Sequence, residues 1–218
     1  IITIEDPVEY RLAMIRQIQV NPKVELTFAS GLRSILRQDP DIIMVGEIRD
    51  EETARIAIQA ALTGHLVFST VHTNDSIGAV TRLVDMGIEP FLVSSAAVGF
   101  VAQRLVRVLC KECKAPYHPT KEELKILALG EGEPRALEIY APVGCPACRK
   151  SGFKGRLAIY EVFTLDEETR AMIVKRVPSE QIKQHAVEHG MKTLKDDGLD
   201  KVKQGITSLE EILRVVQD

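Results

Sequence analysis

Residues 41–50 place acidic and basic side chains directly after an apolar segment, a pattern that could support chemistry on phosphate. Residues 42–45 are apolar and predict a strand that is buried on both faces. Glu47 follows Gly46 at the carboxyl end of this strand, where open α/β sheets bind their ligands. Glu47 is therefore the candidate catalytic acid, and Arg49 follows it closely. A core strand that is capped by a solvated acidic turn accounts for the same pattern equally well.

Two further predicted strands end in polar groups that suit the same chemistry. Residues 1–4 lead into Glu5 and Asp6, and residues 66–71 lead into His72. Because strands alternate with helices in this part of the chain, a parallel sheet is expected, with its carboxyl ends at one edge. Carboxylates at that edge could hold Mg²⁺ or polarise a water, while arginine and histidine could contact phosphate oxygens.

Both histidines near the third strand also have ordinary structural explanations. A single histidine such as His72 more often serves the fold as a hydrogen-bonding group. His65 follows Gly64 at a predicted helix end, where an imidazole interacts favourably with the last carbonyl groups.

The four cysteines of the chain form two Cys-x-x-Cys pairs, Cys110 with Cys113 and Cys145 with Cys148. Two such pairs give four thiolates to one tetrahedral ion, which predicts a structural Zn²⁺ site without an open position for water. The gap over residues 114–144 is wider than in the commonest zinc ribbons. Two disulfides or a redox pair remain the alternatives, although stable disulfides are rare in the cytosol.

The elements that must position these groups follow from apolar periodicity and from helix-capping residues. Gly130–Pro134 predicts a flexible polar turn between the two cysteine pairs. The fold class expected is α/β, with a small tetracysteine element and a C-terminal helical bundle. Strands are predicted at 1–4, 41–47 and 66–71, and helices at 28–37, 51–62, 76–86, 120–129, 167–175, 179–188, 192–204 and after Ser208.

Composition excludes some classes of function. The hydrophobic fraction of 45% and the charged fraction of 27% are ordinary for a globular protein. A net charge of -3 and the lack of tryptophan argue against nucleic acid as a partner. No glycine is followed by lysine, so the phosphate loop G-x-x-x-x-G-K-[ST] is absent. Since the chain opens on Ile1 inside a strand-like segment, we expect a fragment that binds ATP poorly, with that loop upstream.

Three segments together resemble a known family. Residues 2–9 resemble the aspartate box of the type II/IV secretion ATPases, residues 36–50 their Walker B box, and residues 62–75 their histidine box. The resemblance is greatest to the type II secretion assembly ATPases, and the type IV pilus extension ATPases are near neighbours. It implies a RecA-like P-loop NTPase core, a hexameric ring that uses ATP and Mg²⁺, and a cytoplasmic position beside inner-membrane secretion platform proteins.

The resemblance also implies roles for the acidic residues. Glu47 would be the Walker B acid that activates water or holds Mg²⁺, and Glu5 and Asp6 would position metal or water. Arg49 would tie the Walker B turn to its neighbours. Gly46 stands where an aspartate is often found, so Glu47 has no adjacent acidic partner, and the division between metal binding and general-base work stays open.

By the same resemblance, His72 would sense the γ-phosphate and His65 would support it. The tetracysteine element is typical of the assembly ATPases, whereas the retraction ATPases generally lack it. The expected domains are an ATPase core fragment over 1–107, a metal-binding element over 108–158 and a helical subdomain over 159–218. A zinc-bearing protein-binding module, in which the α/β part is only a scaffold, is the alternative from another class.

Overall fold

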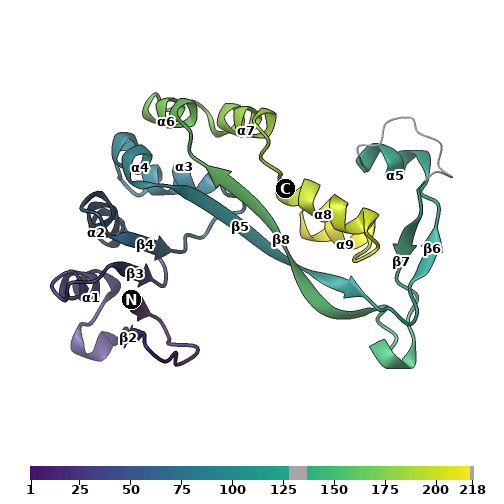
Figure 1. Ribbon diagram of the computed structural model, residues 1–218, viewed down its shortest axis with the longest axis horizontal. Helices are drawn as coiled ribbons and strands as arrows, with labels where there is room; N and C mark the ends of the chain where they lie inside the picture. The colour runs from purple at the N-terminus through teal and green to yellow at the C-terminus, as the bar shows by residue number, and fades with distance from the viewer. Residues whose placement is uncertain (128–136, 217–218) are drawn as a thin grey trace. The chain divides into compact units, whose positions relative to one another are not determined.

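The computed structural model describes residues 1–127 and 137–216 (Figure 1). The turn predicted at Gly130–Pro134 therefore lies outside the described residues. The chain forms two compact units: Ile1–Phe100 with Phe163–His189, and Val101–Val162 with Gly190–Asp218. The three-part domain division expected from the sequence stays a prediction. Within the described ranges, no helix is long and apolar enough to cross a membrane.

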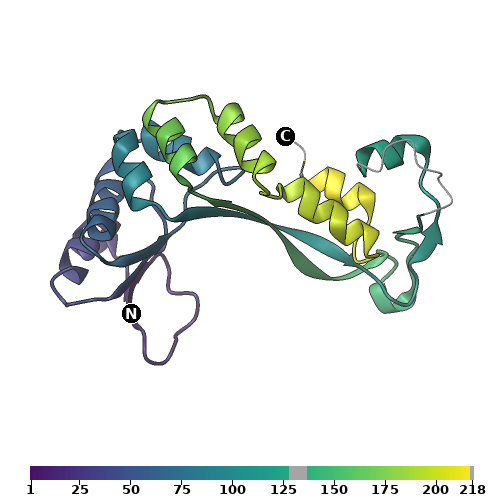
Figure 2. The same cartoon turned by 45° about the horizontal axis from the view of Figure 1, so that its top comes forward.

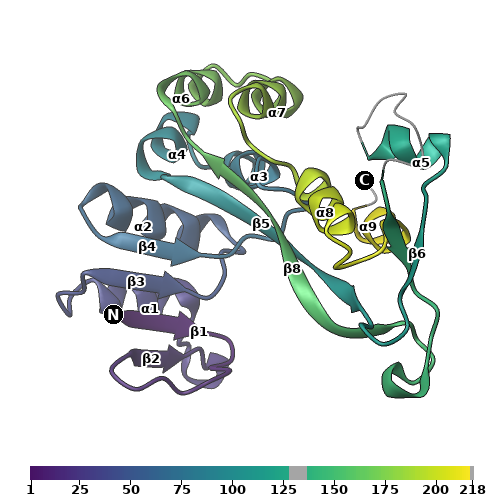
Figure 3. The ribbon, with the colours of Figure 1, turned by 45° about the vertical axis from the view of Figure 1, so that its right-hand side comes forward.

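A four-stranded parallel sheet forms the centre of the first unit, in the order β2-β1-β3-β4. All four arrows point the same way in Figure 3. The three predicted strands are confirmed; the first is shifted by one residue, and the other two are shorter than predicted. β2 was not predicted, because its sequence Arg-Gln-Ile-Gln has a single apolar residue. The strands are β1 (Ile2–Glu5), β2 (Arg16–Gln19), β3 (Ile42–Val45) and β4 (Leu66–Ser69).

Two helices, over residues 28–35 and 51–62, pack on this sheet and bury small or branched apolar residues. Gly31 allows the closest approach, since a Cβ at this position would lie 2.1 Å from the Cδ1 atom of Ile4. Thr27 and Ser30 form a capping box that begins the first helix, and Asp50 caps the second by accepting the N–H of Thr53 at 2.8 Å. The elements are η1 (Pro22–Val24), α1 (Phe28–Ile35), α2 (Glu51–Leu62), α3 (Gly78–Asp85) and α4 (Pro90–Ala96).

Two later helices, α6 (Glu167–Val174) and α7 (Ser179–Glu188), complete the first unit. The guanidinium of Arg170 donates hydrogen bonds to the carbonyl groups of Ser94 and Ala97, which joins α6 to the end of α4. The helices predicted at 167–175 and 179–188 are thus confirmed to within one residue.

The second unit has an antiparallel β-structure that the sequence did not predict. The hydrophobic core of this unit includes Val106, Ile159, Val202 and Ile212. The last two residues come from α8 (Leu194–Lys203) and α9 (Leu209–Val215), which lie side by side (Figure 2). The elements are β5 (Gly99–Leu109) paired with β8 (Phe153–Thr164), β6 (Ala115–Tyr117) paired with β7 (Ile139–Ala141), α5 (Lys121–Ile126), η3 (Pro146–Cys148), α8 (Leu194–Lys203) and α9 (Leu209–Val215).

A buried carboxylate joins α9 to β5 within this unit. The Glu211 side chain is fully buried and accepts hydrogen bonds from the backbone N–H and the guanidinium of Arg107, and from the guanidinium of Arg214. Burial alone would raise the pKa of Glu211, but its bonds with Arg214 and Arg107 outweigh burial and lower that pKa to about 2. Glu211 is therefore ionised in the folded protein at neutral pH.

We predict that Glu211→Gln lowers the free energy of unfolding by about 1–3 kcal/mol at pH 7, because the backbone N–H and two guanidinium groups lose a charged acceptor. The folded pKa lies below the unfolded value of about 4.3, so this stabilisation is complete above pH 4.3 and is lost as the pH falls toward 2. Urea unfolding at pH 7 and at acid pH measures both effects. Glu210→Gln, an exposed neighbour, is the control; equal effects of the two variants would contradict the assignment.

Candidate functional site

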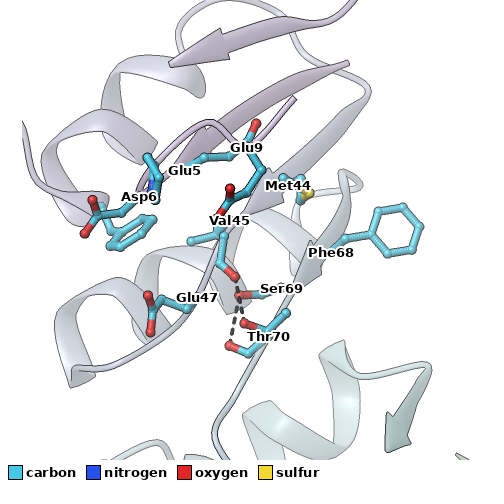
Figure 4. A pocket seen from close by; sticks show the side chains of 12 residues that line it. Glu5, Asp6, Glu9, Met44, Val45, Glu47, Phe68, Ser69 and Thr70 are labelled. Carbon is cyan, nitrogen blue, oxygen red and sulfur yellow. Dashed lines mark hydrogen bonds between the residues drawn. The ribbon is translucent and has the colours of Figure 1, made fainter. Parts of the chain in front are cut away.

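A cavity of about 330 Å³ opens at the carboxyl ends of β1, β3 and β4. Figure 4 shows the acidic side chains of Asp6, Glu9 and Glu47 around it. Parallel pairing of β3 with both neighbouring strands places these strand ends at one edge, as the sequence predicted. The cavity is lined by Glu5, Asp6, Pro7, Glu9, Phe28, Met44, Val45, Gly46, Glu47, Phe68, Ser69 and Thr70.

The glycine before Glu47 is explained by the close approach of β1. A Cβ at Gly46 would lie 3.2 Å from the carbonyl oxygen of Ile4 and 3.3 Å from the Cα atom of Glu5. The Gly46 N–H donates to the Ile4 carbonyl at 2.8 Å, and its own carbonyl accepts the Thr70 hydroxyl at 2.7 Å. An aspartate at this position would therefore crowd the β1 backbone, and Glu47 is the first carboxylate after β3.

Glu47 contacts two of the other predicted site residues at this edge, Arg49 and His72. Arg49 Nε donates a hydrogen bond to Glu47 Oε2, and His72 Nε2 lies 3.2 Å from the same oxygen. The Glu47 side chain is 13% exposed, whereas that of His72 is 82% exposed. The hydrogen bond from Arg49 lowers the pKa of Glu47 against the opposing effect of burial, with a smaller contribution from His72. Glu47 is therefore a carboxylate at neutral pH and is held by a cation.

The aspartate-box carboxylates lie on the β1 side of the cavity. Glu5 Oε1 accepts hydrogen bonds from the Thr3 hydroxyl and from Gln17 Nε2, the latter at 3.0 Å. Glu47 chiefly, and Asp6 more weakly, raise the pKa of the Arg49 guanidinium. The sequence did not single out Gln17, because β2 was not predicted. Gln17 pairs with Thr3 in the register, and its side chain reaches Glu5, two residues further along β1.

His65 lies apart from this group. His65 precedes β4, whereas His72 follows it, so the two histidines lie beyond opposite ends of the same strand. His65 Nδ1 lies 3.0 Å from the carbonyl oxygen of Ala60 at the end of α2, the helix-end contact that was its ordinary structural explanation. A supporting catalytic role for His65 stays a prediction.

The four cysteines meet in the second unit. Their Sγ atoms all lie within 4.8 Å of one another, with Cys110 and Cys145 3.9 Å apart and Cys113 and Cys148 3.8 Å apart. Tetrahedral zinc with Zn–S bonds of about 2.3 Å requires sulfur separations of about 3.8 Å. None of the four is in a disulfide. The donor set and its spacing therefore fit one closed, four-sulfur metal ion.

The electrostatics of this cluster also favour a cation. The backbone N–H of Cys145, helped by that of Gly152, lowers the pKa of the Cys148 thiol to about 6, whereas burial raises the pKa of Cys113 to about 12. Four crowded sulfurs need added positive charge before all of them ionise, and a bound metal ion supplies it.

Comparison with known proteins decides the family. The family model described as "Type II/IV secretion system protein" matches residues 1–214. The chain belongs to this family. The type II secretion system ATPase E of Vibrio cholerae is 53% identical over 218 residues, which is 100% of this chain and 43% of that relative. The type IV pilus assembly ATPase PilB of Thermus thermophilus is 55% identical over 211 residues, 97% of this chain and 24% of that relative.

Solved structures agree with the fold. The pilus retraction motor PilT with bound ADP matches with a TM-score of 0.71 and 28% identity, over 100% of this chain and 52% of that one. The Legionella pneumophila ATPase DotB matches in fold, with a TM-score of 0.65. The predicted family and α/β fold class are thus confirmed. The chain spans less than half the length of the curated secretion-family relatives named above.

We predict one metal ion per chain in the purified secretion-family protein, measured by elemental analysis. Cys145→Ser removes a ligand and should lower the metal content, while Ser151→Ala, beside the cluster, should not. A metal present at a thousand times its Kd stabilises by about 4 kcal/mol, so its chelation should lower Tm by roughly 8–16 °C. Chelation that removes the metal without changing Tm would contradict a structural role.

Proposed function

We propose that this chain is the part of a type II secretion ATPase that carries the acidic edge of the ATP site. The observation that supports this most is the convergence of Glu5, Asp6 and Glu47 on one cavity, with Arg49 and His72 in contact with Glu47. A set of carboxylates for Mg²⁺ or water, together with cationic groups for phosphate oxygens, suits phosphoryl transfer to water.

In this proposal Glu47 activates the attacking water or holds Mg²⁺. Glu5, whose Oε1 atom is oriented by Thr3 and Gln17, and Asp6 position the metal or the water from the other side of the cavity. The γ-phosphate competes with Glu47 for Arg49 and His72, because phosphate oxygens are strong acceptors. Once Arg49 and His72 bind the γ-phosphate instead, Glu47 is free to accept a proton from water. After hydrolysis, Arg49 and His72 bind Glu47 again.

The phosphate loop would come from other residues of the longer protein. The 218 residues contain no G-x-x-x-x-G-K-[ST] sequence. β4 is an edge strand of the sheet, and Leu66 and Phe68 on it are 47% and 54% exposed. An edge strand with exposed apolar residues suits pairing with a further strand, which would bring that loop to the cavity.

We further propose that the ion of the cysteine cluster is Zn²⁺ and that it is structural, since four sulfurs leave no position for water. Cys110, Cys113, Cys145 and Cys148 would hold it. The whole protein is proposed to act as a hexamer in the cytoplasm, at the inner-membrane face of a secretion platform, as the resemblance implied. Nucleic acid is not a proposed partner, because the net charge is -3.

A pilus-assembly ATPase is the second candidate. The identity to the type IV pilus assembly ATPase of Thermus thermophilus, 55%, is as high as that to the type II secretion ATPases. Both candidates require the same chemistry at Glu47. They differ in the membrane machinery that ATP hydrolysis would drive.

We predict that Glu47→Gln lowers kcat for ATP hydrolysis by about 10²–10⁴-fold in the full-length protein, because it removes the general base or metal ligand. Steady-state turnover with Mg²⁺ measures this, and Glu180→Gln, an exposed change on α7, is the matched control. If the chain were only a zinc-bearing binding module, Glu47→Gln would leave partner binding intact. Equal turnover in the parent and the Glu47 variant would exclude the proposed role.

A further inference from the structure

The loop that carries His72 is held at both of its ends. It joins β4 to α3 over residues 70–77. At its start, the Thr70 hydroxyl donates to the Gly46 carbonyl at 2.7 Å, and the Thr70 carbonyl accepts the N–H of Ile48 at 2.9 Å. These bonds tie the loop to the turn that bears Glu47.

Asp75 holds the other end of this loop. Its Oδ1 atom accepts the N–H of Gly78 at 2.7 Å, and its carbonyl accepts the Thr73 hydroxyl at 2.9 Å. A Cβ at Gly78 would lie only 2.8 Å from Asp75 Oδ1, so the glycine is needed for this contact. The Nε2 atom of the exposed His72 ring lies 3.2 Å from Glu47 Oε2. The position of His72 therefore depends on the backbone that Asp75 holds.

The second carboxylate oxygen of Asp75 accepts a hydrogen bond from a helix that is far away in the sequence. Lys183 on α7, 108 residues further along the chain, donates to Asp75 Oδ2 at 3.2 Å. Each side chain is 34% exposed, so the pair is partly shielded from water. Ile182 and Ala186 on the same helix are buried, so this helix packs through its apolar face.

Helix α7 has anchors of its own that do not involve Lys183. His185 Nε2 on α7 lies 3.5 Å from Asp166 Oδ2, at the start of α6. Arg170 in turn joins α6 to Ser94 and Ala97. Since α7 packs on α6 and buries its apolar face, removal of the Lys183 charge should free the loop while α7 keeps its place.

We propose that Lys183 is a positioning residue for ATP hydrolysis: through Asp75 it holds the loop that brings His72 to Glu47. The helix pair that supplies it is covalently continuous at both ends with the second unit, at Phe163 and at His189. Motion of that helix pair therefore reaches the His72 loop through this ion pair. The inference rests on the proposed function, and its test separates the two.

The test compares Lys183→Met, which keeps the aliphatic stem, with Lys183→Arg, which restores the cation, in the full-length protein. Lys175→Met is the control, because Lys175 is exposed and makes no ion pair among the described residues. Hydrogen exchange should show amides of residues 72–78 exchanging about 2- to 5-fold faster in Lys183→Met, with α7 unchanged. This readout does not require ATP turnover.

The kinetic arm then tests the link to the reaction. kcat should fall by a similar factor in Lys183→Met with KM for ATP unchanged, and Lys183→Arg should restore both readouts. Unchanged exchange in the loop, or the same change in Lys175→Met, would overturn the positioning role. Faster exchange with full kcat would overturn the link to hydrolysis. A parent without turnover would count against the proposed function, and the exchange data would still decide whether Lys183 positions the loop.

Discussion

The parallel pairing of β3 with β1 on one side and β4 on the other is the constraint on which the candidate site depends. It places three strand ends at one edge of the sheet, and it brings β1 so close to Gly46 that a side chain there would need the β1 backbone to shift. Glu47 is consequently the first group that can reach the cavity from β3. The same pairing lets Thr70, after β4, bind the Gly46 carbonyl, which connects the turn of Glu47 with the loop of His72.

Charged groups have different roles in the two units. In the first unit Glu47 is held by Arg49 and His72, which are largely exposed and can exchange Glu47 for another anion. In the second unit Glu211 is fully buried between two arginines, and four sulfurs lie close enough together to hold one metal ion. A charge that is paired within reach of solvent can be released, whereas removing one partner of a buried, multiply bonded charge destabilises the fold. That contrast supports a catalytic role for the first group and structural roles for the others.

Local patterns predicted much of the site, and long-range pairing was out of their reach. An apolar strand followed by acids was enough to single out Glu47. β5 and β8 were missed because they are half exposed, with arginine and other polar residues among their apolar ones, and so lack a clear apolar signal. Contacts between Arg107 and Glu211, or between Asp75 and Lys183, span more than a hundred residues and leave no trace in local spacing. His65 is the opposite case, because its position after Gly64 in the sequence was enough to suggest the contact with the end of α2.

A structure of the full-length protein with Mg²⁺ and a non-hydrolysable ATP analogue is the sharpest test of the role proposed for Glu47. We expect the γ-phosphate at the edge of the cavity, with His72 in contact and Glu47 within about 3 Å of the attacking water or of Mg²⁺. We also expect the bonds from Arg49 and His72 to Glu47 to be exchanged for bonds to phosphate. A nucleotide bound elsewhere, with Glu47 still paired to Arg49 and remote from the phosphates, would contradict it.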